Sequence, residues 1–483
     1  ANAGAAGATS CARANDTRQS RLDHIGALSL RARDARVKST PSVRCGKAGA
    51  MQRPWPLVFK DARVLVCDAA GSVFDGDVAV SGEHIVAMGQ GLHGLDEVDC
   101  RGKWLLPGFV QTHIHLVQTL FRGLADDLVL LDWLRTRIWP LERAHDVDST
   151  ATSARLGVNE LLGGGTTTVL DMATVAHTDA VFEVAAAAGL RLFCGKAQMD
   201  RANEAGLSED TDTSMRSAND LADRWHGRGR SRYAYAPRFV PSCTDTLLRA
   251  CAEEARKRGS LLHTHASENL DEVALVRSLT GRDNVEHLDS LGLSGPDVLL
   301  AHCIHLTDAE ASLLARTGTR LLHCPSSNLK LASGIARIPE LLAQGVHVSI
   351  GADGAPCNNR LDAFAEMRLA ALIQKPRLGA TTMNARTVLG LMTREGASAL
   401  GINAGVVATG RLADLIVLDP RRQWTGGDPY SAVVYQLDAR AVDRVYVGGV
   451  LAAQAGTAVG VDPLALAHEA DAALARVRAR AGL

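Results

Sequence analysis

Alternating apolar and polar residues mark both ends of the chain as β-structure. Residues 56–106 contain LVFKDARVLVC, GSVFDGDVAVSGEHIVAMG and VDCRGKWLLP, in which Val and other apolar residues alternate with polar ones and Gly or Asp stands at the breaks. GRLADLIVLD (410–419) and AVDRVYVGGVLAAQAG (441–456) repeat this pattern near the other end. We therefore expect residues 56–106 and 410–456 to form one small β-sandwich domain.

Between these segments, residues 107–409 alternate short apolar runs with Ala-, Leu-, Arg- and Glu-rich helical stretches such as TDTLLRACAEEARKRG. The first expected strand is PGFVQTHIHL, and the other seven are 166–172, 191–198, 232–239, 261–268, 298–305, 319–327 and 347–354. Eight β-then-α units predict parallel strands closed into a (β/α)8 TIM-type barrel, so the fold class is α/β. An amphipathic helix is expected at 462–481, packed on the barrel or on a neighbouring molecule.

The first fifty residues differ from the rest of the chain. They are rich in Ala, Arg and Gly and short of aromatic and β-branched residues, which predicts a disordered extension. Their arginines suit an organelle transit peptide. Alternatively, Met51, which stands just before the first expected strand, is the true first residue, and the start of the sequence was placed too far upstream. Both interpretations stay open, and neither gives residues 1–50 a part in catalysis.

Composition narrows the range of partners. The formal charge is -1, so no overall field favours nucleic acid or an anionic membrane. No uninterrupted apolar stretch reaches the roughly 18 residues of a membrane span. The ten cysteines include no C-x-x-C pair, which is typical of reduced thiols in the cytoplasm. We expect a cytoplasmic protein that binds a small molecule.

Candidate chemistry lies at the ends of the expected strands. Because side chains alternate between the two faces of a strand, His113 and His115 project the same way. A lone H-x-H motif is more often a pair of core or surface histidines than a metal site. However, other strands end in His265 with Glu268, in His302 and in Asp353, and carboxyl ends of barrel strands meet at one face. Several imidazoles with a carboxylate suit Zn²⁺ or Fe²⁺.

The motifs PGFVQTHIHLVQTLFRGLADDLVLLDWL, HTHASEN, LAHCIHL, HCPSSNLKLASGI and GADGAPCNN resemble the amidohydrolase superfamily over residues 56–456. Within it, they resemble the branch of 5'-deoxyadenosine, methylthioadenosine and S-adenosylhomocysteine deaminases and triazine chlorohydrolases. The resemblance implies a barrel flanked by a β-sandwich, a homo-oligomer, and metal ligands at His113, His115, His265 and Asp353. Relatives with two metals bridge them through a lysine at the end of strand four. Arg238 stands there in this chain, which favours one divalent metal, zinc or iron.

The resemblance also implies catalytic roles for three residues. A bound metal lowers the pKa of its water to about 7. Glu268 would accept a proton from that water and deliver it to the ring nitrogen, while His302 orients the water. Asp353 would receive a proton as ammonia departs. The alternatives are a solvated glutamate at a helix start for Glu268 and a core histidine for His302.

Substrate contacts are expected at four positions. Glu142, in RTRIWPLE, lies where such nucleoside deaminases hold the ribose hydroxyls, and a carboxylate can accept both hydroxyl hydrogens. Trp133 forms either an apolar wall or simple helix core. Arg238 replaces a histidine that some relatives carry near the base or ribose, which leaves the ring specificity open. Asn328, with His323, lines the pocket or supports it.

Three functions follow from these residues. The first is hydrolytic deamination of an adenosine-type nucleoside to the hydroxyl or oxo form with release of ammonia. The second is hydrolysis of another aromatic C–X bond, as in a guanine or 8-oxoguanine deaminase or a triazine chlorohydrolase. The third is a barrel without catalysis that serves as a scaffold, which the intact set of candidate ligands with Glu268 argues against.

Overall fold

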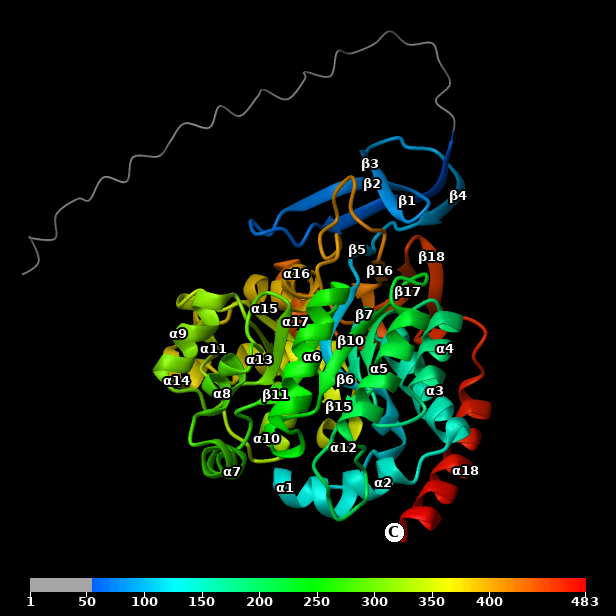
Figure 1. Cartoon of the computed structure of the whole chain (residues 1–483). Helices are drawn as coiled ribbons and strands as arrows, with labels where there is room; N and C mark the ends of the chain where they lie inside the picture. Colours follow the sequence, from blue (N-terminus) through cyan, green and yellow to red (C-terminus); the bar gives the residue numbers. More distant parts are fainter. Residues whose placement is uncertain (1–53) are drawn as a thin grey trace, which may run out of the picture. The chain divides into compact units, whose positions relative to one another are not determined.

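The computed structural model of the chain describes residues 54–483, in which the strands belong to two sheets (Figure 1). The expected extension 1–50 lies outside the described residues. One sheet is a mixed, nine-stranded sheet, and the other is parallel and lies at the centre of the helices. The two sheets correspond to the two patterns read from the sequence.

The parallel sheet closes into a barrel. Its strands are β6 (Phe109–His115), β7 (Thr166–Met172), β8 (Arg191–Gly195), β9 (Ala197–Gln198), β10 (Ser231–Pro237), β11 (Leu261–Ala266), β12 (Val298–His302), β13 (Arg320–His323), β14 (Val348–Ile350) and β15 (Asp353–Gly354). The short strands β14 and β15 are two parts of the eighth strand: β14 pairs with β13, and β15 pairs with β6. The predicted (β/α)8 barrel is therefore confirmed.

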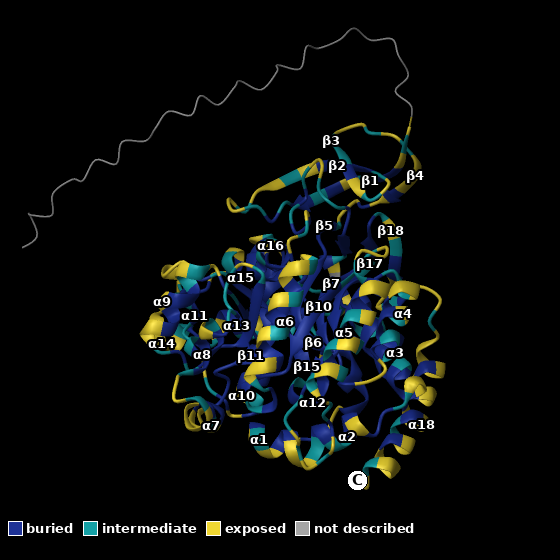
Figure 2. Ribbon diagram, viewed as in Figure 1, coloured by how far each residue is buried: buried dark blue, intermediate teal, exposed yellow. Residues whose placement is uncertain are grey.

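Several of the helices around the barrel carry clear start and stop signals in the sequence. Thr244 caps α6 (Asp245–Arg258) by accepting a hydrogen bond from Leu247 N, and the helix ends at Gly259 with φ +64°. The helix α9 (Asp308–Thr317) begins at a capping box and ends at Gly318 with φ +73° in the same way. Figure 2 shows the result: the strands are buried, and the helices expose their outer faces.

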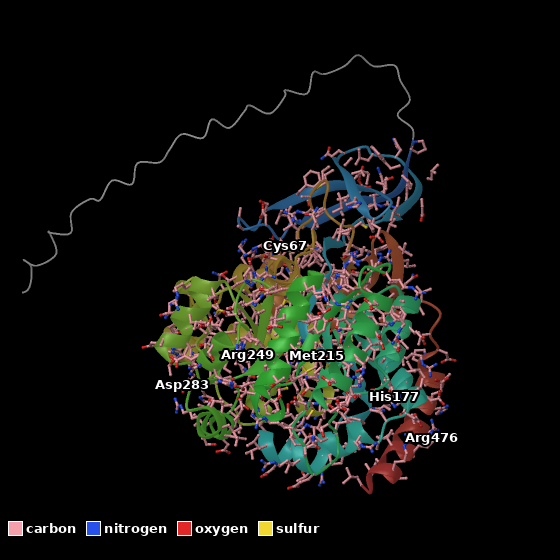
Figure 3. The ribbon with its side chains drawn as sticks, in the orientation of Figure 1. Cys67, His177, Met215, Arg249, Asp283 and Arg476 are labelled. Carbon is pink, nitrogen blue, oxygen red and sulfur yellow. The ribbon has the colours of Figure 1, made fainter. Side chains whose placement is uncertain are left out.

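The remaining helices of the barrel include long covering helices and short turns at its ends. They are η1 (Leu116–Phe121), α1 (Leu130–Trp133), η2 (Leu134–Ile138), α2 (Trp139–Arg143), α3 (Val147–Gly163), α4 (Thr178–Ala188), α5 (Thr211–Trp225), η3 (Val240–Ser242), α7 (Leu270–Thr280), α8 (Asn284–Ser290), α10 (Pro325–Lys330), α11 (Ile338–Ala343), α12 (Ala355–Asn358), α13 (Ala363–Leu372), α14 (Lys375–Leu378), α15 (Ala385–Met392) and α16 (Arg394–Ala399). Met215 of α5, labelled in Figure 3, lies against the barrel, where its sulfur accepts a hydrogen bond from Gln198 Nε2 at 3.2 Å.

The second sheet joins the two ends of the described chain, as the predicted fold class requires. Its strands are β1 (Trp55–Leu65), β2 (Val73–Ser81), β3 (His84–Gly89), β4 (Gly94–Asp99), β5 (Trp104–Pro107), β16 (Leu415–Leu418), β17 (Val442–Val447), β18 (Val450–Gln454) and β19 (Thr457–Ala458). The antiparallel pairing of β5 with β16 connects the N-terminal strands to the C-terminal ones. Apolar side chains from both ends of the chain, among them Phe59, Ile85 and Val417, form a core of their own.

A buried ion pair connects this sheet to the barrel. Arg191, at the start of β8, donates to Asp414 through Nε at 2.8 Å and through Nη2 at 3.0 Å. Asp414 Oδ1 also accepts a hydrogen bond from Gly448 N at 2.7 Å, so both carboxylate oxygens are hydrogen-bonded. The chain passes from β5 to β6 through Gly108, where a Cβ would lie only 2.1 Å from Thr167 Oγ1. A residue with a side chain does not fit at this crossing.

The C-terminal helix α18 (Pro463–Ala481) packs on the barrel. Ala470, Ala473 and Val477 share a buried apolar cluster with Leu120, Phe121 and Leu141. Arg480 donates to the carbonyl oxygen of Ala144 at 2.7 Å and thereby closes the end of the helix onto the same surface. Of the two positions left open by the sequence, the helix takes the one on its own barrel.

Several expected strands end earlier than the sequence pattern indicated, among them those expected at 232–239 and 261–268, which end at Pro237 and Ala266. The strand expected at 319–327 ends at His323, because Pro325 begins α10, where its missing N–H needs no partner. The strand expected at 298–305 ends at His302. Over residues 54–483, every helix is too short or too polar to cross a membrane. The expected cytoplasmic location and homo-oligomer stay predictions.

Candidate active site

The polar side chains predicted from the strand ends converge at the carboxyl-terminal end of the barrel. His113 and His115 come from β6, His265 from β11, His302 from β12 and Asp353 from β15. Glu268 follows β11 directly. A pocket at this end is lined by His115, Leu130, Trp133, Leu134, Arg238, Phe239, His265, Glu268, His302, Leu331 and Asp353.

Hydrogen bonds fix the orientation of two imidazoles. His115 Nδ1 lies 2.7 Å from the carbonyl oxygen of Met172, and His265 Nδ1 lies 2.7 Å from that of Arg238. A carbonyl oxygen only accepts, so Nδ1 must carry the proton in both rings. Burial lowers the pKa of His115 to about 4 and that of His265 well below its usual range, so both rings are neutral near pH 7. Each ring therefore presents an Nε2 lone pair.

His113 and Asp353 complete a cluster that can hold a metal ion. Asp353 Oδ1 lies 3.3 Å from His113 Nε2 and 3.4 Å from His115 Nε2. His113 Nε2 is buried and has no hydrogen-bond partner among residues 54–483, while His113 Nδ1 lies 2.7 Å from His263 Nε2. Burial would raise the pKa of Asp353, but the surrounding histidines hold it well below its usual range. Imidazole nitrogens and one anionic oxygen are a suitable donor set for zinc or ferrous iron.

The backbone is strained at this cluster. Asp353 has a φ of +63° and His302 a φ of +72°, a region in which residues other than glycine are uncommon. Each such residue costs on the order of 1–3 kcal/mol and persists only where the surroundings enforce it. Here Ser327 Oγ donates to Asp353 Oδ2 at 2.6 Å, and Gly354 N donates to Oδ1 at 2.7 Å. The carboxylate is held in place before anything binds.

Glu268 and His302 form a second buried pair beside the cluster. Glu268 Oε2 lies 3.5 Å from His302 Nε2, and His302 Nδ1 donates to Asn328 Oδ1 at 2.8 Å. Burial raises the pKa of Glu268 to about 7. Burial lowers the pKa of His302, but the carboxylates of Glu268 and Asp353 outweigh this effect and leave it raised. Such a pair can accept and return a proton near neutral pH.

An apolar wall forms the other side of the pocket. Leu130, Trp133 and Leu134 come from α1 and η2, Phe239 follows β10, and Leu331 follows α10. The indole N–H of Trp133 is buried and has no acceptor among the described residues. The space open to water between the wall and the cluster is about 30 Å³, which is room for about one or two water molecules.

A buried ion pair lies behind this pocket. Arg238 Nη1 and Nη2 donate to the carboxylate of Glu142 at 2.7 and 3.2 Å. The same carboxylate accepts from Gln118 Nε2 at 2.8 Å and from Thr174 Oγ1 at 3.0 Å. Glu142 is not part of the pocket lining, whereas Arg238 is. The charge of Arg238 and the hydrogen bonds from Arg238 and Gln118 hold the pKa of Glu142 below its usual range despite burial.

The structure brings together most of the candidate residues and separates a few. Trp133 and Arg238 line the pocket, and Asn328 supports His302 from behind. His323 is buried outside the pocket lining, and neither of its ring nitrogens has a partner among residues 54–483. The sequence reading missed His263, although HTH at 263–265 repeats the spacing of HIH at 113–115. No sequence signal pointed to Gln118 or Thr174.

A closed parallel barrel with buried imidazoles and carboxylates at the carboxyl ends of its strands is an arrangement that metal-dependent enzymes use for their active sites. The sequence pattern of the amidohydrolase family matches residues 104–452. The chain belongs to the amidohydrolase family, which confirms the resemblance read from its motifs. Proteins of this family typically bind a divalent metal.

Similar proteins support this assignment over most of the chain. A 5'-deoxyadenosine deaminase of Methanothermobacter thermautotrophicus is 38% identical over 390 residues, which are 79% of this chain and 90% of that protein. A 5-methylthioadenosine/S-adenosylhomocysteine deaminase of Syntrophobacter fumaroxidans is 38% identical over 408 residues, covering 82% and 92% of the two chains. The crystal structure of an adenosine deaminase from Xanthomonas campestris with bound zinc has a TM-score of 0.84 and 30% identity, and covers 88% of this chain and 99% of its own.

Proposed function

We propose that this protein is a metal-dependent hydrolytic deaminase of an adenosine-type nucleoside such as 5'-deoxyadenosine, methylthioadenosine or S-adenosylhomocysteine. Water would replace the exocyclic amine of the ring, giving the oxo product and ammonia. The observation that carries this proposal is the buried carboxyl of Glu268 beside His302 and the histidine–aspartate cluster. Relatives at 38% identity that are named as deaminases of such nucleosides support it.

The metal centre would hold one divalent cation, zinc or ferrous iron. Its proposed ligands are His113, His115, His265 and Asp353. Donor atoms of His113, His115 and Asp353 lie within 4.8 Å of one another, and so do those of His113, His265 and His302. A single metal is favoured because the fourth barrel strand is followed by Arg238, and a bridging lysine is lacking there. When bound, the cation would supply a water of lowered pKa to the site.

Glu268 is the proposed general base and acid. With its pKa raised by burial to about 7, it can take a proton from the water and deliver it to the ring nitrogen beside the attacked carbon. Asn328 holds His302 through Nδ1, so that His302 Nε2 would face the attacking water. There it would stabilise the negative charge that develops on the oxygen during attack. Asp353 would receive the second proton of the attacking water and pass it to the amine, which then leaves as ammonia.

Arg238 is the proposed polar contact for the substrate. The sequence suggested that Glu142 binds the ribose hydroxyls, but in the structure its oxygens already accept four hydrogen bonds. Arg238 lines the pocket and uses one N–H of each Nη on Glu142. The other N–H groups would meet acceptor atoms of the ring or sugar. Trp133 would provide an apolar face and one indole donor.

Substrate entry would require the apolar wall to move. A space of about 30 Å³ accepts the hydrolytic water but not a nucleoside. The wall segment contains η2, a short π-helical turn, and such turns are frequent at functional sites. Outward movement of α1 and η2 would open the pocket, and their return would exclude bulk water.

A substrate panel tests the proposal. Ammonia release by the zinc-loaded protein is measured with 5'-deoxyadenosine, methylthioadenosine, S-adenosylhomocysteine, guanine and 8-oxoguanine, and chloride release is measured with a chlorotriazine. We expect turnover of the adenosine nucleosides only. Turnover confined to guanine, 8-oxoguanine or the triazine would favour the second function read from the sequence, and no turnover with bound metal would favour a scaffold.

A further inference from the structure

His263 lies directly beneath the candidate metal cluster. It precedes His265 by two residues on β11, so both side chains project into the barrel. Its ring is fully buried, and its Nε2 lies 2.7 Å from His113 Nδ1. The two rings meet edge to face, with centroids 4.9 Å apart and an interplanar angle of 85°. No role has been given to His263 by the sequence motifs or by the proposed reaction.

The hydrogen bond between the two rings has only one workable direction. A metal ion takes the lone pair of His113 Nε2, so a neutral His113 must carry its proton on Nδ1. His113 then donates and His263 Nε2 accepts. His263 must in turn carry its own proton on Nδ1, an atom without a partner among the described residues. A buried N–H left unpaired carries a cost, so the arrangement indicates a function other than stability.

His113 differs in this respect from the other two imidazoles. The Nδ1–H groups of His115 and His265 donate hydrogen bonds to backbone carbonyl oxygens, and the positions of these oxygens are set by the strands. The acceptor for His113 is a side chain. Without it, the His113 ring loses the one hydrogen bond that fixes both its rotation and its tautomer.

We propose that His263 is a positioning residue that holds His113 in the metal-binding tautomer and thereby sets how tightly the metal is retained. The inference rests on the proposed metal centre but not on the identity of the substrate. Partners of this kind orient metal-binding histidines, and their loss typically lowers metal affinity by about 10–100-fold.

Zinc retention in three variants tests the proposal. Zinc-loaded wild type, His263→Leu and His263→Gln are challenged with a colorimetric chelator, and the rate of zinc loss is measured. We expect loss to be about 10–100-fold faster in His263→Leu. His263→Gln should retain zinc better than His263→Leu, because the amide oxygen can accept the His113 proton. His287→Leu is the matched control: it removes another buried imidazole, on α8, whose Nε2 lies 3.1 Å from Asp245 Oδ1 and not at the cluster, and it should release zinc at the wild-type rate.

Equal zinc loss in wild type and His263→Leu, or no advantage of Gln over Leu, would overturn the proposal. Nitrogen-15 NMR of the histidines in zinc-loaded wild type tests it without any substitution, should His263→Leu fail to fold. We expect His263 to carry its proton on Nδ1 and to show an unprotonated Nε2; a proton on Nε2 would contradict the inference. Failure of the wild type itself to retain zinc would instead refute the metal centre.

Discussion

Removal of the Glu142 carboxylate tests the buried ion pair behind the pocket. The side chains of Glu142 and Arg238 are 0% and 4% exposed, so Glu142→Ala leaves the guanidinium in a dry environment without its counter-ion. Loss of one partner of a buried pair costs about 3–5 kcal/mol. Gln118 and Thr174 also lose their acceptor, at about 1 kcal/mol for each hydrogen bond. We therefore expect the free energy of unfolding of Glu142→Ala to fall by an amount at or above the upper end of the range of about 3–5 kcal/mol.

Urea unfolding followed by tryptophan fluorescence measures this loss. Glu142→Ala/Arg238→Met removes both charges, so it should be more stable than Glu142→Ala alone. Asp75→Ala breaks the exposed ion pair with Arg63, in which the Arg63 side chain is 42% and the Asp75 side chain 67% exposed. The free energy of unfolding should fall by less than about 1 kcal/mol. A loss in Glu142→Ala no larger than in Asp75→Ala, or a double variant less stable than Glu142→Ala, would refute the reasoning.

Three further predictions follow from the same structure. Burial raises the pKa of Glu268 to about 7, so kcat/KM should fall as the pH drops below that value and the base is protonated. In Glu268→Gln, kcat/KM should be about 100-fold or more lower than in wild type at every pH. Burial raises the pKa of Asp171 from 3.8 to about 7, so between these values the folded state binds a proton that the unfolded state has lost. Stability should therefore decrease as the pH rises through this window, by up to about 4 kcal/mol, and urea unfolding of Asp171→Asn should show a flatter dependence; an unchanged slope would contradict the assignment. In Gly351→Ala, the new Cβ would lie 2.5 Å from the carbonyl oxygen of His113, so elemental analysis should find less zinc than in wild type, and equal zinc would count against a rigid cluster.

The sequence predicted the elements and the strand-end residues well, because both depend on local patterns. A period of two placed His113 and His115 on one face, and the repeat of strand and helix predicted the barrel that brings His302 and Asp353 to the same end. Helix starts within the expected strands were harder to see. Pro325 begins α10 only two residues after β13 ends at His323, inside the stretch expected as one strand.

The contacts of Glu142 show what a local pattern does not contain. Its main partner, Arg238, lies 96 residues further along the chain and reaches it only after the barrel has closed. The sequence supported a carboxylate near the sugar, but whether its oxygens face the substrate or a guanidinium depends on side-chain packing. His263 is a similar case, since its partner His113 is 150 residues away.

The most direct test of hydrolytic deamination follows the oxygen and the nitrogen together. Zinc-loaded protein is incubated with 5'-deoxyadenosine in water enriched in oxygen-18, and the product mass and the ammonia are measured at several times. The account predicts one labelled oxygen in each product molecule and one ammonia for each product molecule, with both formed about 100-fold or more slowly by Glu268→Gln. Product without labelled oxygen, or ammonia formed equally fast by Glu268→Gln, would contradict it.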